Sequence, residues 1–248
     1  MTRVLRALIA SMVLFAGLYQ AIGVAQAQGD LTPESQSQAK ENYAAGKAEM
    51  AKHNYIEAET RFTLAIADER ERPVMSLPER IDLFFMRGNA LFMQREYGEA
   101  VKDFTQAINL KGKPSDPMAK IDQAAIFNLR SQSLLQMRRN GDALRDMDMA
   151  IELAPHVSAY RRQRAITLYS VNRLDEALAD LNVAIGTVSK DSFLYAFRGQ
   201  VHNELGHEDL AKRDFDTASK MDKAGADLVK QFTKSKPPSN KGANKSSK

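Results

Sequence analysis

Histidines and carboxylates are the side chains of this 248-residue chain that could bind a transition metal, because the chain has no cysteine. His202 and His207 lie five residues apart, with Glu204 between them. Two histidine ligands on one helix face need a spacing of four, so this segment is not a helical zinc motif. The sequence therefore predicts no metal site. It predicts turn or surface positions for all four histidines: His53, His156, His202 and His207.

Two Asp-x-Asp sequences suggest a calcium loop, one from Asp146 to Asp148 and one from Asp214 to Asp216. Calcium loops place a glycine turn between their ligands, whereas both of these sequences lie within predicted helices. They are interpreted as solvated helix faces. The chain also lacks the phosphate-binding sequences G-x-x-x-x-G-K and G-x-G-x-x-G. We therefore predict no cofactor and no enzymatic activity.

A fivefold repeat organises the chain. Small residues that open amphipathic helices recur at spacings of 42, 43, 34 and 34 residues, and we call them anchors: Ala58, Ala100, Ala143, Ala177 and Ala211. A large apolar residue stands four residues after each anchor: Phe62, Phe104, Met147, Leu181 and Phe215. A small residue stands twelve residues before each anchor: Gly46, Gly88, Ser131, Ala165 and Gly199. These spacings predict two antiparallel helices per unit, which bury their apolar stripes only by stacking on neighbouring units.

Arginine and aspartate recur together in the last four units. An arginine precedes the small residue: Arg87, Arg130, Arg164 and Arg198. An aspartate stands three residues after the anchor: Asp103, Asp146, Asp180 and Asp214. The first unit has neither, so we expect structural ion pairs, within a unit or across adjacent units. The alternative is an arginine row for an anionic ligand, which is less favoured because an unpaired arginine beside a helix crossing is costly.

This pattern resembles the tetratricopeptide repeat (TPR) family. The clearest unit has the family's residues at the family's spacing: Phe84, Arg87, Gly88, Leu91, Tyr97, Ala100, Phe104 and Ala107. The resemblance implies an all-α fold, a right-handed α-solenoid of about five TPR helix pairs over residues 39–222. A capping helix is expected over residues 223–233. Where the middle units have leucine nine residues before the anchor, the first has Glu49 and the last has His202, as suits solenoid ends that face water.

Two insertions lengthen the 34-residue period, around residues 69–78 and 112–117. They predict longer loops or extended first helices, and the second option is favoured because Leu77 and Pro117 resemble helix starts. Polar residues and glycines predict the turns within the pairs, at His53-Asn54, Gly98, Asn140-Gly141 and Gly206.

The first 27 residues are predicted to be a signal peptide, as in an exported bacterial protein. A short basic start precedes an almost wholly apolar stretch that ends at Val24, and Ala25 and Ala27 are the small residues that signal peptidase recognises. Cleavage after Ala27 would leave an N-terminal linker over residues 28–38 and place the protein in the periplasm. The alternative is an uncleaved anchor in the inner membrane, because about 18 apolar residues approach the spanning length.

The net charge of +4 comes from the two ends of the chain. Residues 1–27 and 230–248 carry eight basic residues and no acidic one, so the body between them is mildly acidic. Nucleic-acid binding requires a basic body, and we predict no such partner. The tail over residues 234–248 is predicted to be disordered, and its lysines could make weak contact with an anionic membrane or cell-wall polymer.

TPR proteins hold peptides or partner proteins in a concave groove lined by the first helix of each pair, and the resemblance implies a similar groove in this chain. Transfer by helical phase gives these groove candidates: Lys40, Tyr43, Lys47, Asp82, Phe85, Asn89, Asn128, Gln132, Arg162, Ile166, Tyr169, Phe193 and Gln200. Amides can donate to and accept from a peptide backbone, and aromatic rings supply contact area. Any one of these residues could equally be an ordinary half-exposed helix residue.

Three functions are compatible with the sequence. The first is a non-enzymatic periplasmic scaffold that binds a partner protein or peptide during envelope assembly or coordination. The second is a similar scaffold tethered to the membrane by an uncleaved first helix. The third is a surface adaptor whose basic tail binds anionic envelope polymers.

Overall fold

Helices make up the regular structure of the chain. The computed structural model describes residues 38–111 and 117–234, and within these ranges there are eleven helices and no strand. Their bounds are α2 Gln38–Ala51, α3 Tyr55–Glu71, α4 Leu77–Met93, α5 Tyr97–Lys111, α6 Pro117–Gln136, α7 Asn140–Leu153, α8 Ser158–Ser170, α9 Leu174–Thr187, α10 Ser192–Glu204, α11 Glu208–Met221 and α12 Lys223–Lys234. The predicted all-α class is confirmed.

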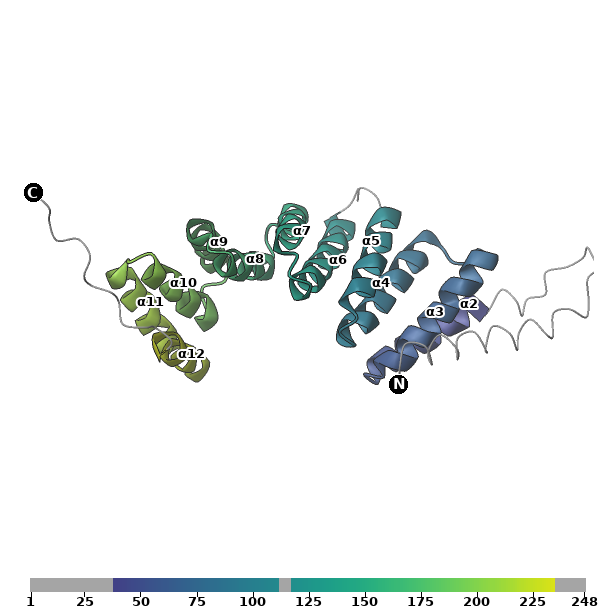
Figure 1. Ribbon diagram of the computed structural model, residues 1–248, viewed down its shortest axis with the longest axis horizontal. Coiled ribbons are helices and arrows are strands. Elements are labelled where there is room, and N and C mark those ends of the chain that lie inside the picture. Colours follow the sequence, from purple (N-terminus) through teal and green to yellow (C-terminus); the bar gives the residue numbers. More distant parts are fainter. Residues whose placement is uncertain (1–37, 112–116, 235–248) are drawn as a thin grey trace, which may run out of the picture. The chain divides into compact units, whose positions relative to one another are not determined.

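The first ten of these helices form five consecutive pairs, each of which is one repeat unit (Figure 1). In each unit the first helix (α2, α4, α6, α8 or α10) packs against the second helix (α3, α5, α7, α9 or α11), which in turn packs against the next first helix. Helix α12 packs against both α10 and α11, where a sixth first helix would lie. The predicted solenoid of five pairs with a capping helix is confirmed.

Within a unit, the small residue of the first helix makes room for the large residue of the second. Three units combine glycine with phenylalanine: Gly46 with Phe62, Gly88 with Phe104, and Gly199 with Phe215. A Cβ atom on Gly88 would lie 2.8 Å from a ring carbon of Phe104, so this close approach requires glycine. The other two units have a larger residue in place of glycine and a smaller one in place of phenylalanine: Ser131 with Met147, and Ala165 with Leu181.

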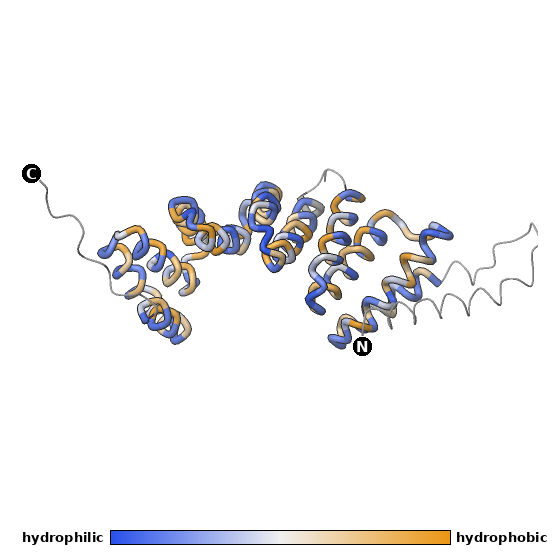
Figure 2. The backbone as a smooth tube through the Cα atoms, viewed as in Figure 1, coloured by the Kyte–Doolittle hydropathy of each residue, from blue (hydrophilic) through white to orange (hydrophobic). Residues whose placement is uncertain are grey.

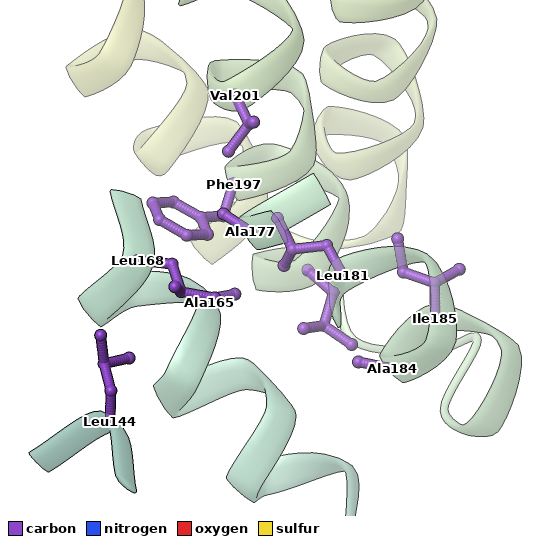
Figure 3. Close-up of a cluster of buried hydrophobic side chains, with 10 residues drawn as sticks. Leu144, Ala165, Leu168, Ala177, Leu181, Ala184, Ile185, Phe197 and Val201 are labelled. Carbon is purple, nitrogen blue, oxygen red and sulfur yellow. The ribbon is translucent and has the colours of Figure 1, made fainter. Parts of the chain in front are cut away.

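The core continues from one unit to the next. One buried cluster combines Leu144 of α7, Leu168 of α8, Leu181 of α9 and Phe197 of α10, so three successive units share it (Figure 3). Figure 2 shows hydrophobic and hydrophilic residues mixed along the same helices. The apolar residues of such a helix are buried partly by the other helix of its unit and partly by the adjacent unit. Stacking of the units therefore stabilises each of them.

The turn inside each pair contains one residue with left-handed backbone, always five residues before the anchor. These residues have φ between 58° and 79°: His53, Arg95, Arg138, Asn172 and Gly206. The turn predictions at Gly98 and Asn140-Gly141 were wrong, because these residues lie in the first turns of α5 and α7. The turn geometry fixes the left-handed position, and arginine tolerates it at a cost of about 1–2 kcal/mol.

The first insertion is an ordered connection between α3 and α4. The Glu69 carboxylate accepts hydrogen bonds from the backbone N–H groups of Val74 and Met75, both at 3.0 Å. Ser76 and Glu79 then form a capping box that starts α4. Helices α4 and α6 have 17 and 20 residues, against 13 in α8 and α10, so extended first helices take up part of both insertions.

Several sequence predictions lie outside the described residues. They concern the signal peptide, residues 28–37 of the linker predicted over 28–38, residues 112–116 of the second insertion, and residues 235–248 of the tail predicted over 234–248. Gln38 is the first residue of α2. Helix α12 ends at Lys234, one residue beyond the predicted end of the capping helix. Within the described ranges, no helix combines the length and the apolar character needed to cross a membrane.

Candidate partner-binding surface

The four recurrent arginines each pair with the aspartate of their own unit. Nε and Nη2 of each arginine donate to the two carboxylate oxygens at 2.6–2.8 Å. The pairs are Arg87–Asp103, Arg130–Asp146, Arg164–Asp180 and Arg198–Asp214. All four aspartates are buried. The interpretation of Asp146 and Asp214 as parts of a solvated face was therefore wrong, whereas Asp148 and Asp216 are exposed.

The same arginines also bond to the preceding unit. Nη1 donates, at 2.6–3.3 Å, to a side chain five residues after the preceding anchor. The acceptors are Thr63 for Arg87, Thr105 for Arg130, Asp148 for Arg164 and Asn182 for Arg198. Hydrogen bonding to Asp180 raises the pKa of Arg164. Each guanidinium thus connects three helices, and we call this set the arginine ladder. Its donors hold the units together and are not directed to a ligand.

The groove candidates of the first two units bond to one another. The Tyr43 hydroxyl donates to Asp82, and Lys47 Nζ lies 3.5 Å from the same carboxylate. Lys40 Nζ lies 3.6 Å from Glu79 at the start of α4. Partial burial, together with the bond to Asp82, raises the pKa of Tyr43. This polar cluster connects α2 with α4, so these side chains already have partners within the protein.

The groove candidates of the last two units also connect neighbouring first helices. Arg162 Nη1 donates to Asp191 at 3.2 Å, and its guanidinium lies over the Phe193 ring at 5.6 Å. Gln200 Nε2 donates to Tyr169 Oη at 3.0 Å. Gln200 is buried, so its amide is part of the contact between α8 and α10. Asp191, which also caps α10, was not singled out in the sequence.

The remaining candidates lie on the first helices of the second, third and fourth units. Asn89 of α4, Asn128 and Gln132 of α6, and Ile166 of α8 are all half-buried. Ile166 packs against the cluster of Figure 3. The three amide side chains, those of Asn89, Asn128 and Gln132, retain partial exposure, which suits contact with a partner segment.

A cleft of about 520 Å³ lies between α4 and α6. Its apolar lining consists of Leu77, Pro78, Ile81, Phe85, Ala125 and Ile126. Its charged lining consists of Asp82, Lys111 and Asp122. Of these nine residues, the predicted groove residues include only Asp82 and Phe85. The spacing of four residues from Leu77 to Ile81 to Phe85 was a usable signal, because it places them on one face of α4.

His202 is buried, so its predicted turn or surface position was wrong. It occupies the core position that has leucine in the middle units, and its Nδ1 lies 3.2 Å from Nδ1 of His207. Burial lowers the pKa of His202. Within the described residues, no group of three or more histidine or acidic side chains could hold a metal ion.

Several solved structures have a similar fold. YrrB, described as a TPR protein with an unusual peptide-binding site, is 16% identical, with a TM-score of 0.65 over 81% of this chain and 94% of YrrB. MamA from Desulfovibrio magneticus RS-1 is 16% identical, with a TM-score of 0.61 over 80% of this chain and 98% of the MamA chain. Apo RapI is 14% identical, with a TM-score of 0.70 over 84% of this chain and 65% of RapI. These likenesses show a shared fold.

The sequence itself supports the same assignment. The family model described as tetratricopeptide repeat matches residues 43–117 and 128–192, which is more than half of the chain. No curated protein matches the sequence significantly. The matched segments run from α2 to the first residue of α10 and include the first three pairs of the arginine ladder. The chain therefore belongs to the tetratricopeptide repeat family.

Proposed function

We propose that this protein is a non-enzymatic scaffold that binds a segment of a partner protein along its first helices. The observation that carries the proposal is the cleft between α4 and α6, whose described lining is mostly apolar, and the same two helices also carry half-buried amides. Concave, largely apolar sites with a few polar groups are the usual places for ligands. The fold shared with YrrB, whose description includes a peptide-binding site, supports this proposal.

Photo-crosslinking in cells that make the protein tests this proposal. A benzoylphenylalanine residue is placed at Asn89, Asn128 or Gln132 on the first helices, and at exposed Lys102 or Val183 on second helices as controls. Crosslinks to a common partner from the first-helix positions alone are expected. Crosslinks confined to the control positions would contradict the proposal.

A double variant measures the contribution of the polar side chains. Replacing Asn89 and Asn128 by alanine removes two half-buried amides that could bond a ligand, at a cost of about 1–3 kcal/mol each, or roughly 5–150-fold in affinity. The crosslinking yield from Gln132 should fall while the melting temperature stays near that of the wild type. The opposite outcome is a normal crosslinking yield in this variant together with a loss of binding when residues 69–78 or 112–117 are changed. That outcome would identify the two insertions as the recognition surface.

We also propose that the protein acts in the bacterial periplasm, in envelope assembly or coordination, after cleavage behind Ala27. The basic, apolar and small-residue pattern of the first 27 residues supports this location. Mass spectrometry of the mature protein tests it. A chain that starts at Gln28 is expected, and an intact N-terminus would instead favour the membrane-tethered scaffold.

The surface adaptor is the second candidate function. Six lysines and no acidic residue within residues 230–248 favour it, because each lysine near an anionic surface contributes at most about 1 kcal/mol. Deleting residues 235–248 should weaken association with envelope fractions at low salt. Equal association of the deleted and full-length proteins at all salt concentrations would eliminate this function.

A further inference from the structure

We infer that the cleft between α4 and α6 receives an apolar side chain of the partner segment, and that a basic residue adjoins this side chain. The inference rests on the proposed scaffold function and adds the chemistry of the ligand. It concerns one site in the chain, which we call the α4–α6 cleft.

The apolar part of the α4–α6 cleft favours a hydrophobic side chain. Leu77 is 47% exposed although it lines the cleft, and Ile81 and Phe85 continue the same face of α4. Ala125 and Ile126 of α6 line the cleft as well. A volume of about 520 Å³ lies within the range of pockets that enclose small ligands, so an aromatic or aliphatic side chain fits. Covering this surface removes apolar area from water, which favours binding.

The charges of the α4–α6 cleft favour a basic neighbour. Asp82 of α4 and Asp122 of α6 both line the cleft. Lys111 Nζ lies 3.5 Å from Asp122, but the lysine side chain is only 14% exposed whereas the Asp122 side chain is 66% exposed. The carboxylate is therefore the group that an incoming ligand meets. Asp122 is also the more exposed of the two carboxylates, since the Asp82 side chain is only 34% exposed, so Asp122 is the more accessible to a ligand cation.

Other parts of the first-helix surface are less suited to this role. Side-chain bonds already connect α2 with α4 through Tyr43 and Asp82, and α8 with α10 through Arg162 and Asp191. A ligand there would have to displace these contacts. Between α4 and α6, by contrast, the described residues line a cleft, and this lining is mainly apolar.

Three acetylated and amidated tetrapeptides test the inference with the purified full chain. Their sequences are Ala-Phe-Lys-Ala, Ala-Phe-Glu-Ala and Ala-Ala-Lys-Ala, and binding is followed by NMR shifts of the methyl groups of Leu77 and Ile81. The Phe-Lys peptide should bind about tenfold more tightly than either of the others, which corresponds to about 1.4 kcal/mol. Equal binding of all three peptides, or shifts only at methyl groups outside the cleft, would overturn the inference.

Two variants separate the apolar and charged contributions. Leu77→Gln should weaken the two Phe peptides several-fold. Val183→Gln is the matched control, because Val183 is 49% exposed on α9, away from the cleft, and should change nothing. Asp122→Asn should remove most of the preference for Phe-Lys over Phe-Glu while the melting temperature stays near that of the wild type. An unchanged preference in this variant would show that Asp122 does not read the cation.

The result is distinguishable from failure of the scaffold function. If the tetrapeptides do not bind but crosslinks form at Asn128 and Gln132, the ligand chemistry proposed for the cleft is wrong and the scaffold function stands. If the Phe-Lys peptide binds as expected but the native protein gives no first-helix crosslink, the cleft chemistry stands and the scaffold function fails.

Discussion

At the scale of single residues, glycine in the first helix decides which side chain the second helix can carry. Phe104 is completely buried, and it occupies the space that a Cβ atom on Gly88 would need. In the fourth unit, Ala165 and Leu181 occupy the same two positions and are both fully buried. The two combinations are alternative ways of filling one interior volume at the packing density of a protein core.

This volume relation predicts coupling between the two positions. Gly88→Ala should lower the free energy of unfolding by about 1–3 kcal/mol, because the methyl group overpacks a buried ring. Combining it with Phe104→Leu, which recreates the pairing of the fourth unit, should cost less than the sum of the two single changes. Urea denaturation followed by circular dichroism measures all four proteins. Additive costs would show that the two positions do not share one volume.

The buried His202 predicts a loss of stability in mild acid. Its pKa is lowered in the folded state, so the unfolded chain binds the proton more readily. The contribution of neutral His202 to the free energy of unfolding is complete above the pKa of about 6.5 that histidine has in the unfolded chain. This contribution is lost as the pH falls from there to the lower pKa of the folded state. His202→Leu should therefore gain stability relative to the wild type as the pH falls below 6.5.

Urea denaturation between pH 8 and pH 5 measures this difference. The groups that face His202 are Asp214, Arg198 and His207, and none of them is changed in the variant. His156→Gln, at an exposed position, is the control and should follow the wild type. Parallel curves for the wild type and His202→Leu at all pH values would contradict the prediction.

At the scale of helices, the arginine ladder holds each of the first helices α4, α6, α8 and α10 to two second helices. Arg130→Ala should lower the free energy of unfolding by about 3–5 kcal/mol, because it leaves the carboxylate of Asp146 buried without its cation. Arg145→Ala is the matched control on α7, since its side chain is 74% exposed and its pair with Asp142 is on the surface. Melting curves of both variants test this, and similar melting temperatures would show that the ladder contributes little.

At the scale of the molecule, each repeat unit is stabilised by its contacts with the neighbouring units. Helix α12 covers the last unit: Phe232 packs against Phe197, and Gly225 lies in close contact with α11 and Ser192. Truncation after Asp222 should therefore reduce amide protection in α10 and α11, and much less in α4 to α6, because each unit contacts only its neighbours. Hydrogen-exchange mass spectrometry measures this.

Truncation after Lys234 retains α12 and is the control, with protection expected to equal that of the full chain. A uniform loss of protection over all helices after truncation at Asp222 would show that the solenoid unfolds as one cooperative unit. Loss of protection confined to α10 and α11 is the outcome that nearest-neighbour stabilisation predicts.

The sequence by itself determined the repeat and its ion pairs. The anchors, small residues and large residues recur at helical spacing, and this periodicity reflects backbone geometry that every helix shares. The arginine of each unit, such as Arg130, and its aspartate, such as Asp146, are both present in the last four units and both absent from the first. This joint occurrence indicated that the two residues pair. The acceptor in the preceding unit, such as Thr105, followed no such pattern, because its residue type varies from unit to unit.

Only the tertiary structure decided which side chains of the first helices bond to one another and which line the α4–α6 cleft. Asp191 accepts a hydrogen bond from Arg162, and Leu77 lines the same cleft as Asp122, although about 45 residues separate the last two in the sequence. His202 is buried although its residue type favours the surface. Contacts of this kind depend on how successive units rotate against one another and which rotamers then fit. The periodicity of the sequence predicts neither the rotation between units nor the rotamers, because a helix has the same residue pattern in any stacking arrangement.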